Sequence, residues 1–293
     1  MVFGGRSERA RTVLVYGNCQ AAPLALALSA IDDLNDDYRF VVAFNHPVPG
    51  ELTAPCIPDE DLKDVALVLR QVEDRTNNPA LEALTSRLPA NCPVIRYPTF
   101  MLFCGWPFEC METRERHDPA YPVFKRYPYG DMLALQIAES GLTGPLAVAA
   151  YMDLSCRKMP NMQVRLERDI ARMQHYDALS DVRLSDYVLD RFRDEHLFWT
   201  SGHVSGKGVA ELARRVAEQA RPVLGGSAAR AEACLAAGSV HWDMGGHQNP
   251  IHPLVAEALQ LRFWQADATY RWGTQQWNFY EYIQRNIEYD TSW

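Results

Sequence analysis

The sequence has no long apolar run. Residues 1–11 lack the uninterrupted apolar core of a secretion signal, and no stretch approaches the length of a membrane span. Basic residues are the minority, with 29 Lys and Arg against 37 Asp and Glu and a formal net charge of −8. Binding to phosphate backbones needs concentrated positive charge, so nucleic acid is not an expected partner. We therefore expect a cytoplasmic protein without a membrane span.

Closely spaced cysteine pairs are also missing. The seven cysteines are scattered along the chain, and an odd number cannot all pair within it. Cys104 and Cys110 lie near His117, but their spacing matches no zinc-binding pattern. We expect reduced thiols and no bound metal.

What the sequence does contain is the pattern of an α/β fold. Apolar residues make up 47% and charged residues 23%, the balance of an ordinary globular protein. Short apolar runs predict strands at 12–16, 40–44, 65–72 and 93–97, and helical patterns occupy 21–34 and 79–88. Strands that alternate with helices predict a parallel sheet with helices on both faces, which makes three layers.

The rest of the chain has mostly helical patterns. We expect helices at 131–140, 164–175, 185–193 and 206–220, an irregular excursion at 101–129 and a loose helical connector at 221–239. Five of the seven tryptophans follow residue 240, which indicates an aromatic C-terminal segment packed on the main domain. The predicted organisation is an N-terminal tail at 1–10, an α/β catalytic domain at 11–222 and a C-terminal extension at 223–293.

Cys19 is the most informative single residue. It lies between the first predicted strand and the following helix, where open α/β sheets bind ligands in a crevice. Helix amides at this place stabilise a thiolate, the nucleophilic form, and can hold an oxyanion. The neighbouring Gly17, Asn18 and Gln20 are expected to contact the ligand. The alternative is a small, unreactive turn residue.

His203 is the candidate partner of Cys19. It lies in a glycine-rich loop just before the predicted helix at 206–220. An imidazole can take the thiol proton and return it to a leaving group, so we predict a Cys-His dyad with His203 as general base. A surface loop histidine without a catalytic role is the plainer alternative.

Polar residues follow the second and third predicted strands at the same sheet edge. Gln71 is predicted to add a donor to an oxyanion hole, and Asp74, three residues later, is expected to contact the ligand. Capping and loop solvation are the alternative for both. Asn45 and His46 end the second strand. His46 is a rival base, although Pro47 makes a structural turn the simpler explanation.

Basic residues suggest where a phosphate would bind. Lys125 and Arg126 lie among aromatic residues, where they could hold a phosphate beside a stacked base. Lys207, at the start of the helix at 206–220, is a second candidate. Solvated surface charges are the alternative for all three.

Four motifs give the chain a resemblance to a known family. Tyr-Gly-Asn-Cys-Gln at 16–20, Leu-Arg-Gln-Val-Glu-Asp at 69–74, Gly-His at 202–203 and Asn-Pro-Ile-His-Pro at 249–253 resemble the WcbI family of capsular polysaccharide biosynthesis proteins. The resemblance implies coenzyme A binding and an acetyltransferase activity in capsule assembly. The element order is also similar to SGNH hydrolases, with Cys19 at the position of the serine and His203 at that of the histidine. Those enzymes carry an aspartate three residues before the histidine, where this chain has Thr200.

The resemblance implies an acyltransferase that uses acetyl-coenzyme A, or another coenzyme A thioester, as co-substrate and a sugar or similar hydroxyl as acceptor. Two other functions remain open. One is a thiol esterase or hydrolase on the same framework, and the other is a non-catalytic coenzyme A or glycan-binding protein in which Cys19 is structural.

Overall fold

The structure is a computed structural model that describes residues 1–7, 9–47, 56–73, 78–110 and 130–291. It divides into two compact units, each built from three segments. Unit 1 comprises Met1–Met101, Ile170–Asp190 and His203–Met244, and unit 2 comprises Leu102–Asp169, Arg191–Gly202 and Gly245–Trp293. This division differs from the predicted boundary after residue 222, because residues 223–244 fold with unit 1 and residues 102–169 with unit 2.

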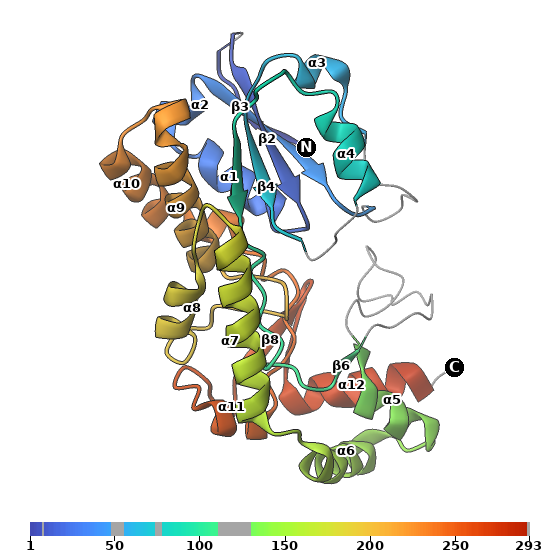
Figure 1. The fold of residues 1–293 in the computed structure, drawn as a ribbon. Coiled ribbons are helices and arrows are strands. Elements are labelled where there is room, and N and C mark those ends of the chain that lie inside the picture. Colours follow the sequence, from blue (N-terminus) through green and yellow to red (C-terminus); the bar gives the residue numbers. More distant parts are fainter. Residues whose placement is uncertain (8, 48–55, 74–77, 111–129, 292–293) are drawn as a thin grey trace. The chain divides into compact units, whose positions relative to one another are not determined.

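Unit 1 contains a five-stranded mixed sheet, whose strands are drawn as arrows in Figure 1. Its order is β1-β3-β2-β4-β5, formed by Val2–Gly4 (β1), Arg11–Gly17 (β2), Tyr38–Phe44 (β3), Val65–Gln71 (β4) and Val94–Tyr97 (β5). The last four strands are parallel, as predicted, while β1 pairs antiparallel with β3. The expected tail at 1–10 therefore contributes an edge strand.

Helices flank this sheet. Helix α1 (Ala21–Ser29) packs against β2 and β3, and α9 (Gly206–Leu224) packs against α1, β4 and β5. Alternate strand residues, among them Leu14 and Val41, form a separate cluster with Leu62 of α3 (Asp59–Leu62) and with apolar side chains of α4 (Pro79–Thr85). Unit 1 is thus an α/β structure with a mixed, largely parallel sheet.

Further helices complete unit 1. They are α2 (Asp32–Asn35), α8 (Ser185–Arg191), α10 (Ala228–Gly238) and the 3-10 helix η1 (Ser239–Trp242), and α7 (Met162–Leu179) contributes residues to both units. The connector predicted to be loose at 221–239 is regular: α9 continues to Leu224, Gly225 ends it with a positive φ, and α10 follows. The helix predicted at 164–175 is also longer at both ends.

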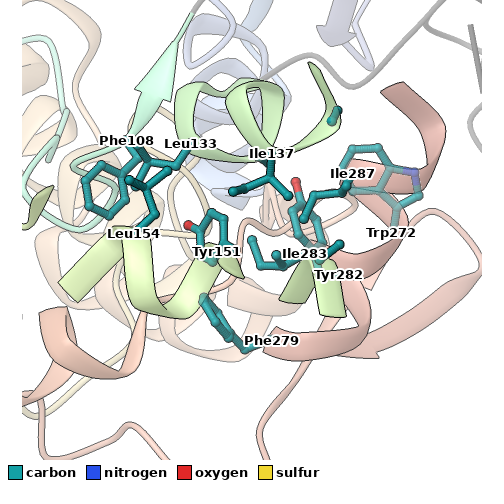
Figure 2. Packing of buried hydrophobic residues seen from close by; sticks show 13 residues of the cluster. Phe108, Leu133, Ile137, Tyr151, Leu154, Trp272, Phe279, Tyr282, Ile283 and Ile287 are labelled. Atoms are coloured by element: carbon teal, nitrogen blue, oxygen red, sulfur yellow. The ribbon is translucent and has the colours of Figure 1, made fainter. Parts of the chain in front are cut away.

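Unit 2 is mainly helical. Its elements are β6 (Glu109–Cys110), β7 (Gly130–Asp131), α5 (Met132–Glu139), α6 (Gly144–Lys158), α11 (Pro253–Leu259), β8 (Thr269–Trp272), β9 (Gln275–Asn278) and α12 (Phe279–Thr291). Figure 2 shows the core, in which Tyr151, Ile283 and Ile287 join α6 to α12. No helix in the described part of the chain has the length and apolar character needed to cross a membrane.

Candidate active site around Cys19

Cys19 lies at the topological switch point of the sheet in unit 1. The chain runs from β2 to β3 on one side and then returns to β4 on the other side of β2. In doubly wound sheets ligands bind at the carboxyl ends of the two strands where the direction of winding reverses. Cys19 lies two residues after the end of β2, and Gln71 ends β4. The predicted position at the mouth of the sheet is therefore observed.

Two buried glutamines hold the Cys19 turn. Gln71 Oε1 accepts a hydrogen bond from Asn18 N at 2.8 Å, and Gln71 Nε2 donates to Gln20 Oε1 at 3.0 Å. Gln20 also binds the backbone of Phe100, donating to its carbonyl at 2.5 Å and accepting from its N–H at 3.1 Å. The turn is thus tied to both β4 and the segment after β5. These bonds make Gln71 the residue that fixes the turn, and its predicted donation to an oxyanion stays a prediction.

Asn18 and Gly17 both shape the turn that contains Cys19. Asn18 Oδ1 accepts from Gln20 N at 2.9 Å, which closes the turn locally. A Cβ on Gly17 would lie 2.5 Å from the Tyr97 hydroxyl and 2.7 Å from Gln71 Oε1. Both neighbours are fully buried, so no side chain fits at position 17 without displacing them.

The Cys19 thiol is protonated at neutral pH. Burial raises its pKa to about 11, and the backbone amides of Cys19 and Gln20 lower the pKa by less than burial raises it. This corrects the expectation that helix amides stabilise a resting thiolate. A nucleophilic Cys19 consequently requires a base that removes its proton during reaction.

His203 lies three residues before α9, and the start of α9 is held by several contacts within unit 1. Asp243 accepts a hydrogen bond from Gly206 N at 2.7 Å, and Trp242 Nε1 donates to the Gly206 carbonyl at 3.2 Å. An added Cβ on Gly206 would lie 1.8 Å from the Ser239 carbonyl oxygen, so only glycine allows this approach. Ser205 then caps α9 through Gly208 N. The loop enters α9 in a defined geometry.

Phe100 connects the Cys19 turn to the start of α9. Its backbone binds Gln20, next to Cys19, while its ring lies 3.0 Å from the position of a Cβ built on Gly208. Gly208 is five residues after His203 and in the first turn of α9. The structure therefore brings both segments of the predicted dyad to one shared neighbour within unit 1. A direct bond between Cys19 and His203 stays a prediction.

Asn45, also predicted at this edge, belongs to a second polar cluster. Asn45 Nδ2 donates to Glu73 at 2.7 Å, and Asn78 donates to Glu73 and to the Tyr16 hydroxyl. His46 instead donates to the carbonyl of Pro47, at 2.7 Å. This bond agrees with the simpler interpretation of His46 as part of a turn.

Sequence reasoning missed Tyr97, Phe100 and Glu73. The Tyr97 hydroxyl donates to the Tyr16 carbonyl at 3.0 Å, beneath the Cys19 turn. The available signal was the strand predicted at 93–97: its carboxyl end shares the sheet edge with Cys19, so the residues that end and follow it belong to the same site.

The remaining candidates are one acidic and three basic residues. Asp74, Lys125 and Arg126 lie outside the described residues, and Lys207 is exposed in the first turn of α9. All seven cysteines are free. In the part of the chain that the structure covers, no group of three or more His, Cys, Asp or Glu side chains is arranged to hold a metal ion.

Comparison with known proteins places this site in a family. A solved structure of WcbI superimposes on this chain with a TM-score of 0.67. WcbI is described as a novel polysaccharide biosynthesis enzyme, and the structure is of the native protein without a disulfide bond between coenzyme A and one of its cysteines. That match has 13% identity and covers 97% of this chain and 91% of the other, which shows a common fold. No curated protein matches significantly. The profile of the family described as polysaccharide biosynthesis enzyme WcbI matches residues 12–221, which include Cys19, Gln71 and His203. The chain therefore belongs to the WcbI family of polysaccharide biosynthesis enzymes.

Proposed function

We propose that the protein is an acyltransferase, most simply an O-acetyltransferase, that moves an acyl group from coenzyme A to a sugar hydroxyl. Cys19 and His203 form the dyad that carries the acyl group and its protons. The observation that carries the proposal is the Cys19 turn itself: a thiol held at the switch point of the sheet by Gln20 and Gln71 and tied through Phe100 to the His203 segment.

The known protein with the same fold supports the choice of donor. Its description names coenzyme A together with a cysteine. In this chain Cys19 follows the first parallel strand, and it is the cysteine at the carboxyl ends of β2 and β4. A coenzyme A thiol end in the crevice would meet this side chain. Lys207 is the described cation nearest in sequence to His203 and a candidate for a donor phosphate.

The protonated state of Cys19 assigns a role to His203. In the first step His203 takes the thiol proton as Cys19 Sγ attacks the thioester carbonyl, the bond from that carbonyl to the coenzyme A sulfur breaks, and the proton passes to the departing sulfur. In the second step the sugar oxygen attacks the acyl-cysteine carbonyl while His203 accepts the hydroxyl proton. The bond from that carbonyl to Cys19 Sγ breaks, and the proton passes from His203 to Sγ. The Cys19 amide, with Gln71 behind it, faces the oxyanion as in SGNH-like sites.

The test is to trap the acyl-enzyme. The full chain is incubated with acetyl-coenzyme A without acceptor, and peptides are analysed by mass spectrometry. We expect an acetyl group on Cys19 and none on Cys156, an exposed cysteine that serves as the internal control. The Cys19→Ser protein should still bind coenzyme A in a calorimetric titration, because the thiol contributes little to ground-state binding.

The two alternatives give different results in the same experiment. A hydrolase would release acetate and free coenzyme A continuously without any sugar present. A binding protein would retain coenzyme A but show neither acetylated Cys19 nor turnover, and that outcome would remove the catalytic dyad from the account.

A further inference from the structure

Unit 2 contains a pocket that is lined by both aromatic and polar side chains. It lies between the loop before β6, the start of α5, α6, the segment before α11 and α12. The enclosed part of the pocket has a volume of about 40 Å³, and the empty space reaches about 420 Å³ when the open solvent at its mouth is included. Aromatic side chains form much of its wall, and Figure 2 shows Tyr151, Phe279 and Tyr282 together beneath α5. This combination of apolar walls and a few polar groups is typical of small-molecule sites.

Asn286 of α12 is the unusual member of the lining. It is 1% exposed, and neither its Oδ1 nor its Nδ2 has a hydrogen-bond partner among the described residues. Buried amides in folded proteins are nearly always hydrogen-bonded, because leaving them unpaired is costly. An amide in the lining of a pocket that has no partner among the described residues is a candidate contact for a ligand that supplies both a donor and an acceptor.

The Asn-Pro-Ile-His-Pro motif at 249–253 builds the opposite wall. The Asn249 carbonyl accepts from Trp106 Nε1 at 3.2 Å, and Asn249 Oδ1 accepts from the Tyr282 hydroxyl at 3.3 Å. His252 is hydrogen-bonded to Ser155 at 2.9 Å and caps α11 through Leu254 N. The motif therefore positions the aromatic walls of this pocket. This role is separate from the Cys19 site.

The charge of the lining restricts the ligand. None of the described lining residues is Lys or Arg, and burial lowers the pKa of His252 to about 4, so this imidazole is neutral. Glu109 and Asp131 add carboxyl groups, and burial raises the pKa of both. A phosphate would meet no positive charge here, so the pocket does not suit coenzyme A. An amide that needs both a donor and an acceptor equally disfavours a simple cation.

We propose that this pocket binds one ring of a neutral sugar, with adjacent hydroxyl groups on the Asn286 amide and the apolar ring face against the walls at Trp106 and Phe279. A hydroxyl both donates and accepts, so two neighbouring hydroxyls satisfy Oδ1 and Nδ2 together. The carboxyl group of Glu109, held by Ser201 at 2.6 Å, lies in the same lining and adds a polar contact. The pocket is defined within unit 2 alone. The pocket would be the acceptor site of the proposed transferase, so this inference rests on the proposed function.

The experiment measures sugar binding to the full chain without coenzyme A. Methyl glycosides of glucose, galactose and mannose are titrated by ligand-observed saturation-transfer NMR and by tryptophan fluorescence, with inorganic phosphate and tetramethylammonium as charged comparisons. We expect at least one glycoside to bind and both ions to fail. Asn286→Leu, which removes the unpaired amide, should weaken that glycoside about tenfold or more. Gln284→Leu, on the same helix but outside the pocket and paired with Glu288, is the matched control and should bind as the wild type does.

Protein stability separates a binding role from a structural one. Because the Asn286 amide has no hydrogen-bond partner among the described residues, Asn286→Leu should unfold at the same temperature as the wild type or higher while losing sugar binding. Equal glycoside binding by Asn286→Leu, binding of tetramethylammonium in place of sugars, or no glycoside binding at all would each overturn the proposal. A sugar that binds this pocket in a protein that never becomes acetylated at Cys19 would leave the pocket intact and refute the proposed transfer reaction.

Discussion

The Cys19 turn and the unit 2 pocket both contain buried side-chain amides, and they use them in opposite ways. In unit 1 the amide of Gln71 is joined to Asn18 and Gln20 on its two ends. In unit 2 the amide of Asn286 is as deeply buried and has no hydrogen-bond partner among the described residues. The first arrangement fixes a backbone in place, whereas the second leaves hydrogen-bonding capacity for a ligand.

Under the proposed function, the two regions would serve two different steps of the reaction. A covalent step needs a nucleophile within a few tenths of an ångström of its productive position, so the groups around it are satisfied in advance. A binding step gains affinity from groups that the ligand is the first to satisfy. Substitutions that exchange an amide for an apolar side chain should therefore have opposite effects on the two regions.

The largest expected effect is on turnover. Cys19→Ser and His203→Ala should each reduce kcat by at least about 10³-fold, because each removes one half of a unit that moves the acyl group and its proton. The double variant should be little slower than either single variant, and coenzyme A binding should persist. Steady-state kinetics and calorimetry measure both properties, with Cys156→Ser as the control. If the fold-reduction of kcat in the double variant equals the product of the two single reductions, Cys19 and His203 have separate roles. Full activity of Cys19→Ser would exclude the thiol from the mechanism.

A loss of stability should follow from Gln71→Leu. The change leaves Asn18 N–H without its acceptor and removes one donor from Gln20 Oε1 in a buried site, so the free energy of unfolding should fall by about 3 kcal/mol. Urea denaturation measures the change. Gln163→Leu, which removes an exposed pair with Glu167 on α7, should change stability by less than about 0.5 kcal/mol. Equal effects of the two substitutions would mean that Gln71 does not hold the turn.

A pH effect on stability should come from Asp131 in the unit 2 pocket. Burial raises the pKa of its carboxyl group from 3.8 to about 6, although Leu133 N, Ala134 N and the Tyr151 hydroxyl all donate to it. A raised pKa favours the protonated form in the folded state, so its contribution to stability is fully present below about pH 4 and lost as pH rises through about 6. Asp131→Asn cannot titrate. The stability of the wild type relative to this variant should fall by about 1–2 kcal/mol over that interval, after allowance for solvent screening. Parallel stability curves in urea across these pH values would contradict the assignment.

The smallest effect is a gain in stability. Asn286→Leu replaces an unpaired buried amide by an apolar group of similar size, so the free energy of unfolding should rise by about 1 kcal/mol. The sign is opposite to that for Gln71→Leu, which is the sharpest test of the comparison between the two regions. A clear loss of stability in Asn286→Leu would show that the amide already has a structural partner.

Much of unit 1 is predictable from sequence, because its strands are short apolar runs separated by helices along the first hundred residues. The parallel strands that contain Val13, Val42, Leu67 and Val94 were all expected, and so was the place of Cys19 after the first of them. Strand β1 was missed because three residues carry too little pattern to mark a strand. Helix α6 had no prediction either, since its apolar residues do not gather on one face.

The protonation of Cys19 illustrates what local reasoning omits. The sequence shows the thiol at the mouth of a helix, where backbone amides lower its pKa. The larger influence is desolvation, which depends on every segment that packs over the site and raises the pKa to about 11. A prediction built from neighbours in the sequence therefore had the wrong sign.

The sequence by itself determined the parallel sheet, the position of Cys19 at its edge and the resemblance that led to the family. Periodicity and strand-end position are local properties of the chain, so they can be recognised before folding is considered. The tertiary structure alone decided that Phe100 links the Cys19 turn to the start of α9, and that Asn286 lines a pocket with Trp106 and the 249–253 motif. These neighbours come from segments more than 30 residues apart in the chain, and only burial and packing bring them together.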